Sequence, residues 1–199
     1  MRFLLIIAFI LSIKSSVFAN EIKSITIEGI TIRDSALNFF SEDEIKKVII
    51  TDWKSKKYER SEIKSKKFNK FDLIQISYLS DDKEFKIAEI KGLIKFKYSK
   101  CIKEINQMSK KIKKKIPDIQ IQPSFEYENK WDTFGESKTT DIIIAINSKN
   151  KSGVLDTITL FCYQYSDGYK KEMNLSDDDL GIRISSKEFD KFLFIEAYK

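Results

Sequence analysis

One long amphipathic helix limits the folds that are open to this chain. Between Ser99 and Ile116, apolar side chains recur three or four residues apart, which predicts a helix with a single buried stripe. The positions in this stripe are Cys101, Ile102, Ile105, Met108, Ile112 and Ile116. Pro117 ends the helix. The stripe has a width that suits packing against a sheet, so the rest of the chain must provide a sheet with an apolar face.

Segments with a period of two lie on both sides of this helix in the sequence. The expected strands cover residues 22–27, 57–64, 71–79, 85–96, 120–127, 141–147, 157–165 and 180–185. We expect the second to fourth of them to form an antiparallel meander, with its lysine-rich first strand at an edge. The order of helices and strands predicts an α+β fold: a mainly antiparallel sheet with helices packed on one face.

Local signals mark several turns and helix ends. Ser41 and Glu44 form a capping box that starts a helix with Ile45, Val48 and Ile49 on its buried side. Short helices are also expected over residues 35–40, capped by Asp34, and after Ser185-Ser186 at the C-terminus. Gly92 indicates a bulge or bend, Pro123 restricts its segment to a sheet edge, and Asp167-Gly168 indicates a turn.

The first nineteen residues have the pattern of a secretory signal peptide. Arg2 precedes an apolar run from Phe3 to Ile13, and Val17-Phe18-Ala19 forms a small-x-Ala cleavage site. The run is shorter than the roughly 20 residues that span a bilayer, and no later segment approaches that length. We therefore expect cleavage after Ala19, a single mature domain over 20–199 without a transmembrane segment, and a periplasmic or secreted protein.

A stretch near the mature N-terminus resembles a known family. The run from Ile27 to Ile45, IEGITIRDSALNFFSEDEI, is similar to the opening of a family of small uncharacterised exported bacterial proteins with an I-x-G-I-[ST]-I-x-D-S-x-L-x-x-F-S-E-x-E-I start. Arg33 replaces a glycine of that family, which argues against a positive φ at this position. The resemblance implies export and the fold, and it favours a Gram-negative envelope over another secretion route; it transfers no catalytic residue.

Composition excludes several classes of function. The chain has no histidine, which removes the usual zinc and copper ligand sets and the Ser-His and Cys-His nucleophile pairs. The net charge of +6 comes almost entirely from lysine, whereas specific phosphate recognition favours arginine. We therefore expect no metal, no cofactor and no nucleic-acid partner, and we interpret the protein as non-catalytic, since only carboxylate, lysine or tyrosine chemistry remains.

The two cysteines are candidates for a disulfide. Cys101 lies on the buried stripe of the long helix, and Cys162 shares a strand face with Ile158 and Leu160. An even number of cysteines in an oxidising compartment favours a bridge between them. The alternative is a pair of buried thiols that pack as small hydrophobic groups.

The segment from Phe125 to Glu136 alternates aromatic and acidic side chains. Its candidate ligand- or partner-binding residues are Phe125, Glu126, Tyr127, Glu128, Trp131 and Phe134. If exposed, they would offer a stacking and hydrogen-bonding surface for a sugar or peptide; otherwise they form a hairpin whose aromatic rings cover the core. Glu126 and Glu128 point the same way on a strand, so a glycosidase-like carboxylate pair is a further possibility.

The end of the long helix carries a cluster of cations. Its lysines are Lys110, Lys111, Lys113, Lys114 and Lys115. They could bind anionic lipid or polysaccharide. Equally, they could be a solvated face whose charges stabilise the negative end of the helix dipole.

Three functional hypotheses follow. The first is a non-catalytic binding or structural protein of the bacterial envelope, whose partner is an envelope protein or a small ligand. The second is a carboxylate-based hydrolase of an envelope polymer, acting through Glu126 and Glu128. The third is a peripheral binder of anionic lipid or polysaccharide through Lys110 to Lys115.

Overall fold

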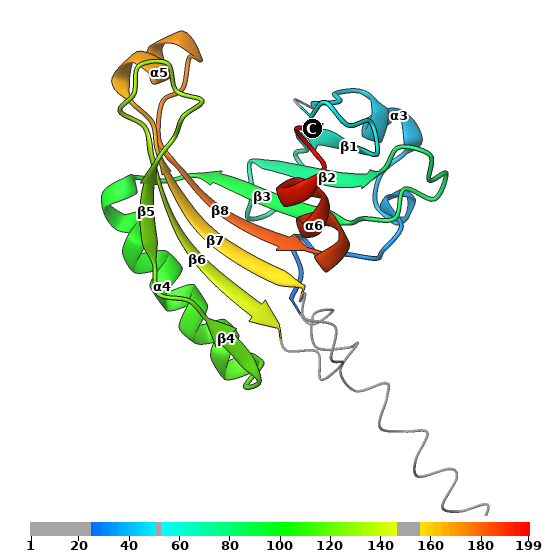
Figure 1. Ribbon diagram of the computed structural model, residues 1–199, viewed down its shortest axis with the longest axis horizontal. Helices are drawn as coiled ribbons and strands as arrows, with labels where there is room; N and C mark the ends of the chain where they lie inside the picture. The colour runs from blue at the N-terminus through cyan, green and yellow to red at the C-terminus, as the bar shows by residue number, and fades with distance from the viewer. Residues whose placement is uncertain (1–24, 51–52, 147–155) are drawn as a thin grey trace, which may run out of the picture.

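The computed structural model describes residues 25–50, 53–146 and 156–199 (Figure 1). The predicted signal peptide, its cleavage site after Ala19 and the start of the first expected strand lie outside these described residues. Among the residues within them, no helix combines the length and apolar character needed to cross a membrane.

Eight strands form one antiparallel sheet in the described part of the chain. Their order is β1-β2-β3-β8-β7-β6-β4, and β5 also pairs with β6. The strands are β1 (Tyr58–Ile63), β2 (Leu73–Leu79), β3 (Glu89–Lys95), β4 (Ile119–Ile121), β5 (Phe125–Glu128), β6 (Lys138–Ile146), β7 (Thr157–Gln164) and β8 (Asp179–Ser185). The helices are η1 (Ala36–Asn38), α3 (Glu42–Lys46), α4 (Tyr98–Lys115), α5 (Asp167–Glu172) and α6 (Lys187–Ile195). The predicted α+β fold with a mainly antiparallel sheet, the meander β1-β2-β3 and the edge position of β1 are confirmed. The helices, however, pack on both faces of the sheet and not on one.

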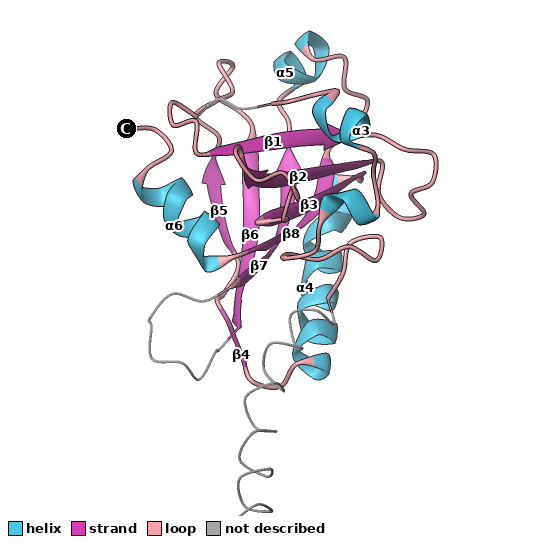
Figure 2. Ribbon diagram, turned by 90° about the vertical axis from the view of Figure 1, so that its right-hand side faces the viewer, coloured by secondary structure: helices cyan, strands magenta, loops and turns pink. Residues whose placement is uncertain are grey.

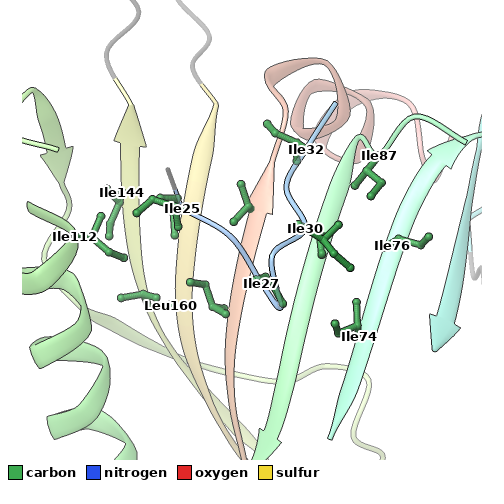
Figure 3. Packing of buried hydrophobic residues seen from close by; sticks show 14 of the residues in the cluster. Ile25, Ile27, Ile30, Ile32, Ile74, Ile76, Ile87, Ile112, Ile144 and Leu160 are labelled. Carbon is green, nitrogen blue, oxygen red and sulfur yellow. The ribbon is translucent and has the colours of Figure 1, made fainter. Parts of the chain in front are cut away.

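One face of the sheet holds the main core, and α4 covers it. Alternate residues of β6, β7 and β8 contribute Ile144, Leu160 and Ile182, and α4 contributes Ile105 and Ile112. The N-terminal segment from residue 25 to residue 40 lies against the same face and adds a row of isoleucines (Figure 3). The amphipathic stripe of the sequence therefore packs on a sheet, as predicted.

A disulfide joins α4 to the sheet. Cys101 and Cys162 are bonded, and both are completely buried within the main core. The bridge closes a sequence separation of 61 residues. The predicted disulfide is confirmed, and the alternative of two buried thiols is wrong.

A second, smaller core lies on the other side of the sheet. Phe189 and Phe192 of α6 pack with Trp53 and Tyr58. The ring centroids of each phenylalanine lie 4.7–5.6 Å from those of Trp53 and Tyr58. Ser186 caps α6 by accepting a hydrogen bond from the Phe189 amide, as the sequence predicts for this region. Figure 2 shows α4 and α6 on opposite sides of the strands.

The N-terminal elements are shorter than predicted. Ile27 forms only an isolated bridge with Ile30 across a turn at residues 28 and 29, so the described part of the first expected strand pairs at a single residue. The helix expected over residues 35–40 is the single 3₁₀ turn η1, and its N-cap is Ser35 and not Asp34. The chain turns between Ile27 and Ile30 because Glu28 and Gly29 both have positive φ.

The capping box at Ser41 and Glu44 is confirmed, but its helix is short. The Ser41 hydroxyl accepts from the Glu44 amide, and the Glu44 carboxylate accepts from the Ser41 amide. The prediction that Val48 and Ile49 lie on the buried side is wrong, since they are 41% and 40% exposed. Their backbone instead follows the edge strand β1: the Glu62 amide donates to the Val48 carbonyl, so the helix has already ended.

Arg33 has a left-handed backbone despite its side chain. Its φ is 72°, so the expectation based on the missing glycine is wrong. Two sets of contacts hold this conformation: the Arg33 amide donates to the Ile87 carbonyl, and the guanidinium makes a bidentate pair with Asp156 at 2.9 and 3.0 Å.

Three further local predictions need correction. Gly92 is not a bulge, because its pairing with Ile74 and Ile182 is in register on both sides; the ring of Phe71 covers it where a Cβ would stand. Pro123 lies between two short strands, β4 and β5, and not inside one. The turn at residues 167–168 is the start of helix α5, capped by the Ser166 hydroxyl.

Candidate functional site

The face of the sheet opposite α4 carries charged and aromatic side chains. Strand alternation places Glu89 and Lys91 of β3 on this face, because Ile90 between them points into the main core. The pairing register puts Lys91 opposite Arg183 and Arg183 opposite Thr159. Side chains from strands far apart in the sequence therefore gather on one surface, which we call the open face.

A cavity of about 230 Å³ lies on the open face. We call it the open-face cleft. Its lining residues are Trp53, Arg60, Glu89, Lys91, Tyr127, Asp141, Thr159, Phe161, Tyr163, Arg183, Leu193 and Tyr198. They come from six strands (β1, β3, β5, β6, β7 and β8), from α6, from the segment before β1 and from the residues after α6. The cleft therefore exists only in the folded protein.

A buried carboxylate lies at one end of the cleft. Glu89 is 1% exposed, and it accepts hydrogen bonds of 2.8 Å from Arg60 and from Ser77. Burial opposes ionisation of Glu89, but the charges of Arg60 and Arg183 outweigh it, so the pKa of Glu89 is lowered. The Arg60 guanidinium also lies over the ring of Trp53, 4.7 Å from the centroid, which fixes its position.

Arg183 links the cleft to α6. Its Nη2 donates to Asp190 Oδ1 at 2.8 Å, and the same carboxylate accepts from Ser185 and Thr157. Arg183 Nε is buried without a hydrogen-bond partner among the described residues, and it lies 4.0 Å from Glu89 Oε1. The cleft therefore contains an arginine with one unused donor.

A carboxyl group with altered acidity lies on the other side of the cleft. Asp141 Oδ2 accepts a hydrogen bond of 3.1 Å from the Tyr127 hydroxyl, while Oδ1 is buried without a partner among the described residues. Burial raises the pKa of Asp141, against the opposing effects of Tyr127, Arg183 and Lys91. Burial, with the charge of Asp141, also raises the pKa of Tyr127.

The ammonium group of Lys91 lies above two aromatic rings of β7. Its Nζ is 4.9 Å from the centroid of Phe161 and 5.1 Å from that of Tyr163, and it donates to the Tyr163 hydroxyl at 3.3 Å. Within the described residues, Lys91 forms no ion pair with a carboxylate. The ring of Phe161 packs directly against the backbone of Gly181 on the next strand, because glycine has no Cβ that would overlap the ring.

The aromatic residues predicted from the sequence are on the surface. Phe125, Tyr127, Trp131 and Phe134 are 42–50% exposed, so they do not fill the core. Tyr127 lines the cleft and stacks with Phe125, with ring centroids 5.9 Å apart. The interpretation of this segment as a core-covering hairpin is therefore wrong for these four rings.

Trp131 and Phe134 belong to a separate cluster at the α5 end of the molecule. Trp131 contacts Tyr163, Tyr165 and Tyr169, with its closest centroid distance, 4.8 Å, to Tyr169. Tyr163 therefore joins the cluster to the cleft. Phe134 packs over Gly168 of α5. The four predicted aromatic residues thus lie at two separate places, and of these four only Tyr127 lines the cleft.

The two predicted carboxylates point away from the cleft. Glu126 faces the α4 side of β5 and accepts from the Tyr98 hydroxyl at 2.8 Å and from Lys138 at 3.2 Å. These two hydrogen bonds lower the pKa of Glu126. Glu128 is exposed on the same strand. A carboxylate that is held ionised suits a general acid poorly.

The predicted cationic cluster has a structural component. Lys113 donates to the carbonyls of Pro117 and Ile119 at 2.7 Å each, so it closes the end of α4. Lys110, Lys111 and Lys114 are exposed along the helix.

The sequence alone did not single out most of the cleft. Arg60, Glu89, Lys91, Asp141 and Arg183 each lie in a segment that was predicted as a strand, but none was proposed as a site residue. A signal was present in the sequence. Glu89, Lys91 and Arg183 are charged residues on one side of strands whose other side consists of isoleucine, leucine and glycine. In the described ranges, no group of histidine, cysteine, aspartate or glutamate side chains could hold a metal ion.

Comparisons with known proteins identify no family. No family model matches the chain, and no curated protein matches it. One solved structure that it resembles is that of cyanobacterial PsbP (CyanoP) from Synechocystis sp. PCC 6803, with 10% identity, 74% of this chain and 84% of that chain covered, and a TM-score of 0.32. A TM-score of this size does not establish a shared fold, so function must be inferred from the open face itself.

Proposed function

We propose that this protein is an exported, non-catalytic binding protein of the bacterial envelope and that the open-face cleft holds a small ligand. The observation that carries this proposal is the composition of the cleft. It combines aromatic walls, among them Phe161 and Tyr163, with two buried polar atoms that lack partners among the described residues, Asp141 Oδ1 and Arg183 Nε. Such a combination is typical of small-molecule sites, in which a few polar groups orient a ligand between apolar walls.

Two features support export. The disulfide between Cys101 and Cys162 is the kind of bond that persists in oxidising compartments. The N-terminal sequence through Ala19 has the order of a signal peptide. The test is an intact mass of the protein recovered from its native host: we expect a chain that starts at Asn20, and a chain that retains Met1 would contradict export.

Binding is tested with a panel of small anionic, neutral and cationic aromatic compounds, amino acids and monosaccharides. We expect at least one compound to raise the melting temperature of the wild-type protein. We also expect the protein to leave every compound of the panel chemically unchanged. Tyr163→Ala removes a wall of the cleft and should weaken this binding at least tenfold. Tyr169→Ala, a matched change in the cluster around Trp131 and outside the cleft, should alter it less than twofold.

Two results would contradict the proposal. One is equal loss of binding in Tyr163→Ala and Tyr169→Ala, which would place the site elsewhere. The other is conversion of a panel compound to product by the wild-type protein, which would make the protein an enzyme.

A further inference from the structure

We propose that the ligand of the open-face cleft carries a single carboxylate on an aromatic or apolar body, and that Lys91 anchors this carboxylate. The inference rests on the proposed function, because it names the ligand class of the same cleft. It is carried by the distribution of charge among the lining residues.

The three cations of the cleft differ in how they are balanced. Arg60 is paired with Glu89 at 2.8 Å, and Arg183 with Asp190 at 2.8 Å. Lys91 has no such carboxylate within the described residues; its contacts are the Tyr163 hydroxyl and two ring faces. An ammonium group above an aromatic face is stabilised by about 0.5–2 kcal/mol, which is weaker than a hydrogen-bonded ion pair inside a cleft. Lys91 is therefore the group in the cleft best able to accept an anion.

The surroundings select a monoanion. Asp141 and Glu89 both line the cleft, and their charges would repel a doubly charged group such as phosphate. Arg183 lies directly opposite Lys91 in the pairing of β3 with β8, but its charge is already shared between Asp190 and Glu89. One carboxylate facing the ammonium group of Lys91 therefore balances the charge of this cleft better than a dianion does.

The aromatic rings specify the rest of the ligand. When Lys91 turns toward a carboxylate, it leaves the faces of Phe161 and Tyr163, whose centroids lie 4.8 Å apart. Those faces then become available to an apolar or aromatic group, which gains by stacking on them. A cavity of about 230 Å³ fits a small molecule of this kind.

The experiment uses four probes of known charge: benzoate, benzamide, benzylammonium and inorganic phosphate. Binding to the full mature protein is measured by NMR titration at low salt. We expect benzoate to bind at least tenfold more tightly than its neutral isostere benzamide, and more tightly than benzylammonium and phosphate. Lys91→Met keeps an unbranched side chain of similar length and removes its charge. In this variant the preference for benzoate over benzamide should fall below twofold.

Lys95→Met is the matched control. Lys95 lies on the same face of β3 and is paired with Asp179 at 3.1 Å, so its loss should leave the preference for benzoate intact. Equal binding of benzoate and benzamide by the wild-type protein, or an undiminished preference in Lys91→Met, would overturn the carboxylate inference alone. Failure of all four probes to bind would also overturn this inference, whereas the proposed function is contradicted only if the wider panel of compounds fails to bind as well.

Discussion

Glu89 provides the sharpest test of the energetics of the open face. It is 1% exposed and lies between Arg60 and Arg183, with a further hydrogen bond from Ser77. Replacing Glu89 by alanine leaves Arg60 without this buried carboxylate. Removing one partner of a buried ion pair costs about 3–5 kcal/mol, and we expect a value near the lower limit because Arg183 keeps its pair with Asp190.

The assay is urea unfolding at pH 7, followed by tryptophan fluorescence. The two tryptophans are Trp53, which is buried and lies under Arg60, and Trp131, which is 48% exposed. Glu84→Ala is the matched control, because Glu84 is paired with Lys86 at 2.8 Å while both side chains are more than 60% exposed. We expect Glu84→Ala to cost at most about 1 kcal/mol. Equal losses of unfolding free energy in Glu89→Ala and Glu84→Ala would refute the buried-pair argument.

The ionisation of Glu89 also predicts how the stability of the protein depends on pH. The pKa of Glu89 in the folded protein is lowered from 4.5, so its contribution to stability is complete above about pH 4.5 and is lost as the pH falls through the lower folded value. Glu89→Gln cannot titrate at this position. We therefore expect the stability difference between wild type and Glu89→Gln to be largest near neutral pH and to shrink below pH 4.5; a difference that grows on acidification would contradict this sign.

Three other predictions concern the core, the floor of the cleft and a helix cap. Replacing Cys101 and Cys162 by serine should lower the unfolding free energy by about 4 kcal/mol, because the bridge closes a loop of 61 residues in the unfolded chain; a loss below 1 kcal/mol in thermal or urea unfolding would contradict this. Gly181→Ala should cost about 1–3 kcal/mol, since a Cβ there overlaps the ring of Phe161, and the cost should fall in a Phe161→Leu background. Ser41→Ala should cost about 1 kcal/mol in the same unfolding assay, because it removes the capping hydrogen bond of α3; no measurable change would show that the cap is unimportant.

The sequence predicted the elements whose causes are local. The stripe of α4 and the alternation of β2 depend on side chains a few residues apart, and the capping box at Ser41 needs only Glu44. Elements that depend on distant contacts were missed or misplaced. The left-handed backbone of Arg33 is supported by Asp156, which is far away in the chain, and no local pattern indicates that pair.

The same reasoning explains why most of the site was not predicted. Phe125 to Phe134 form a cluster in the sequence, so their aromatic character was visible, and their exposure on the surface agrees with a binding role. The charges of the cleft come from three separate regions, represented by Arg60, Lys91 and Arg183. They meet only because β3 pairs with β8 as well as with β2, and strand pairing across such distances is not encoded in any local pattern.

The most direct test of the central claim is to map the binding site by NMR with isotope-labelled protein and benzoate. We predict that the largest chemical-shift changes fall on Lys91, Phe161 and Asp141, whose side chains line the open-face cleft. Changes confined to the exposed lysines of α4, such as Lys110, or to the cluster around Trp131 would show that the ligand binds elsewhere and would contradict the account.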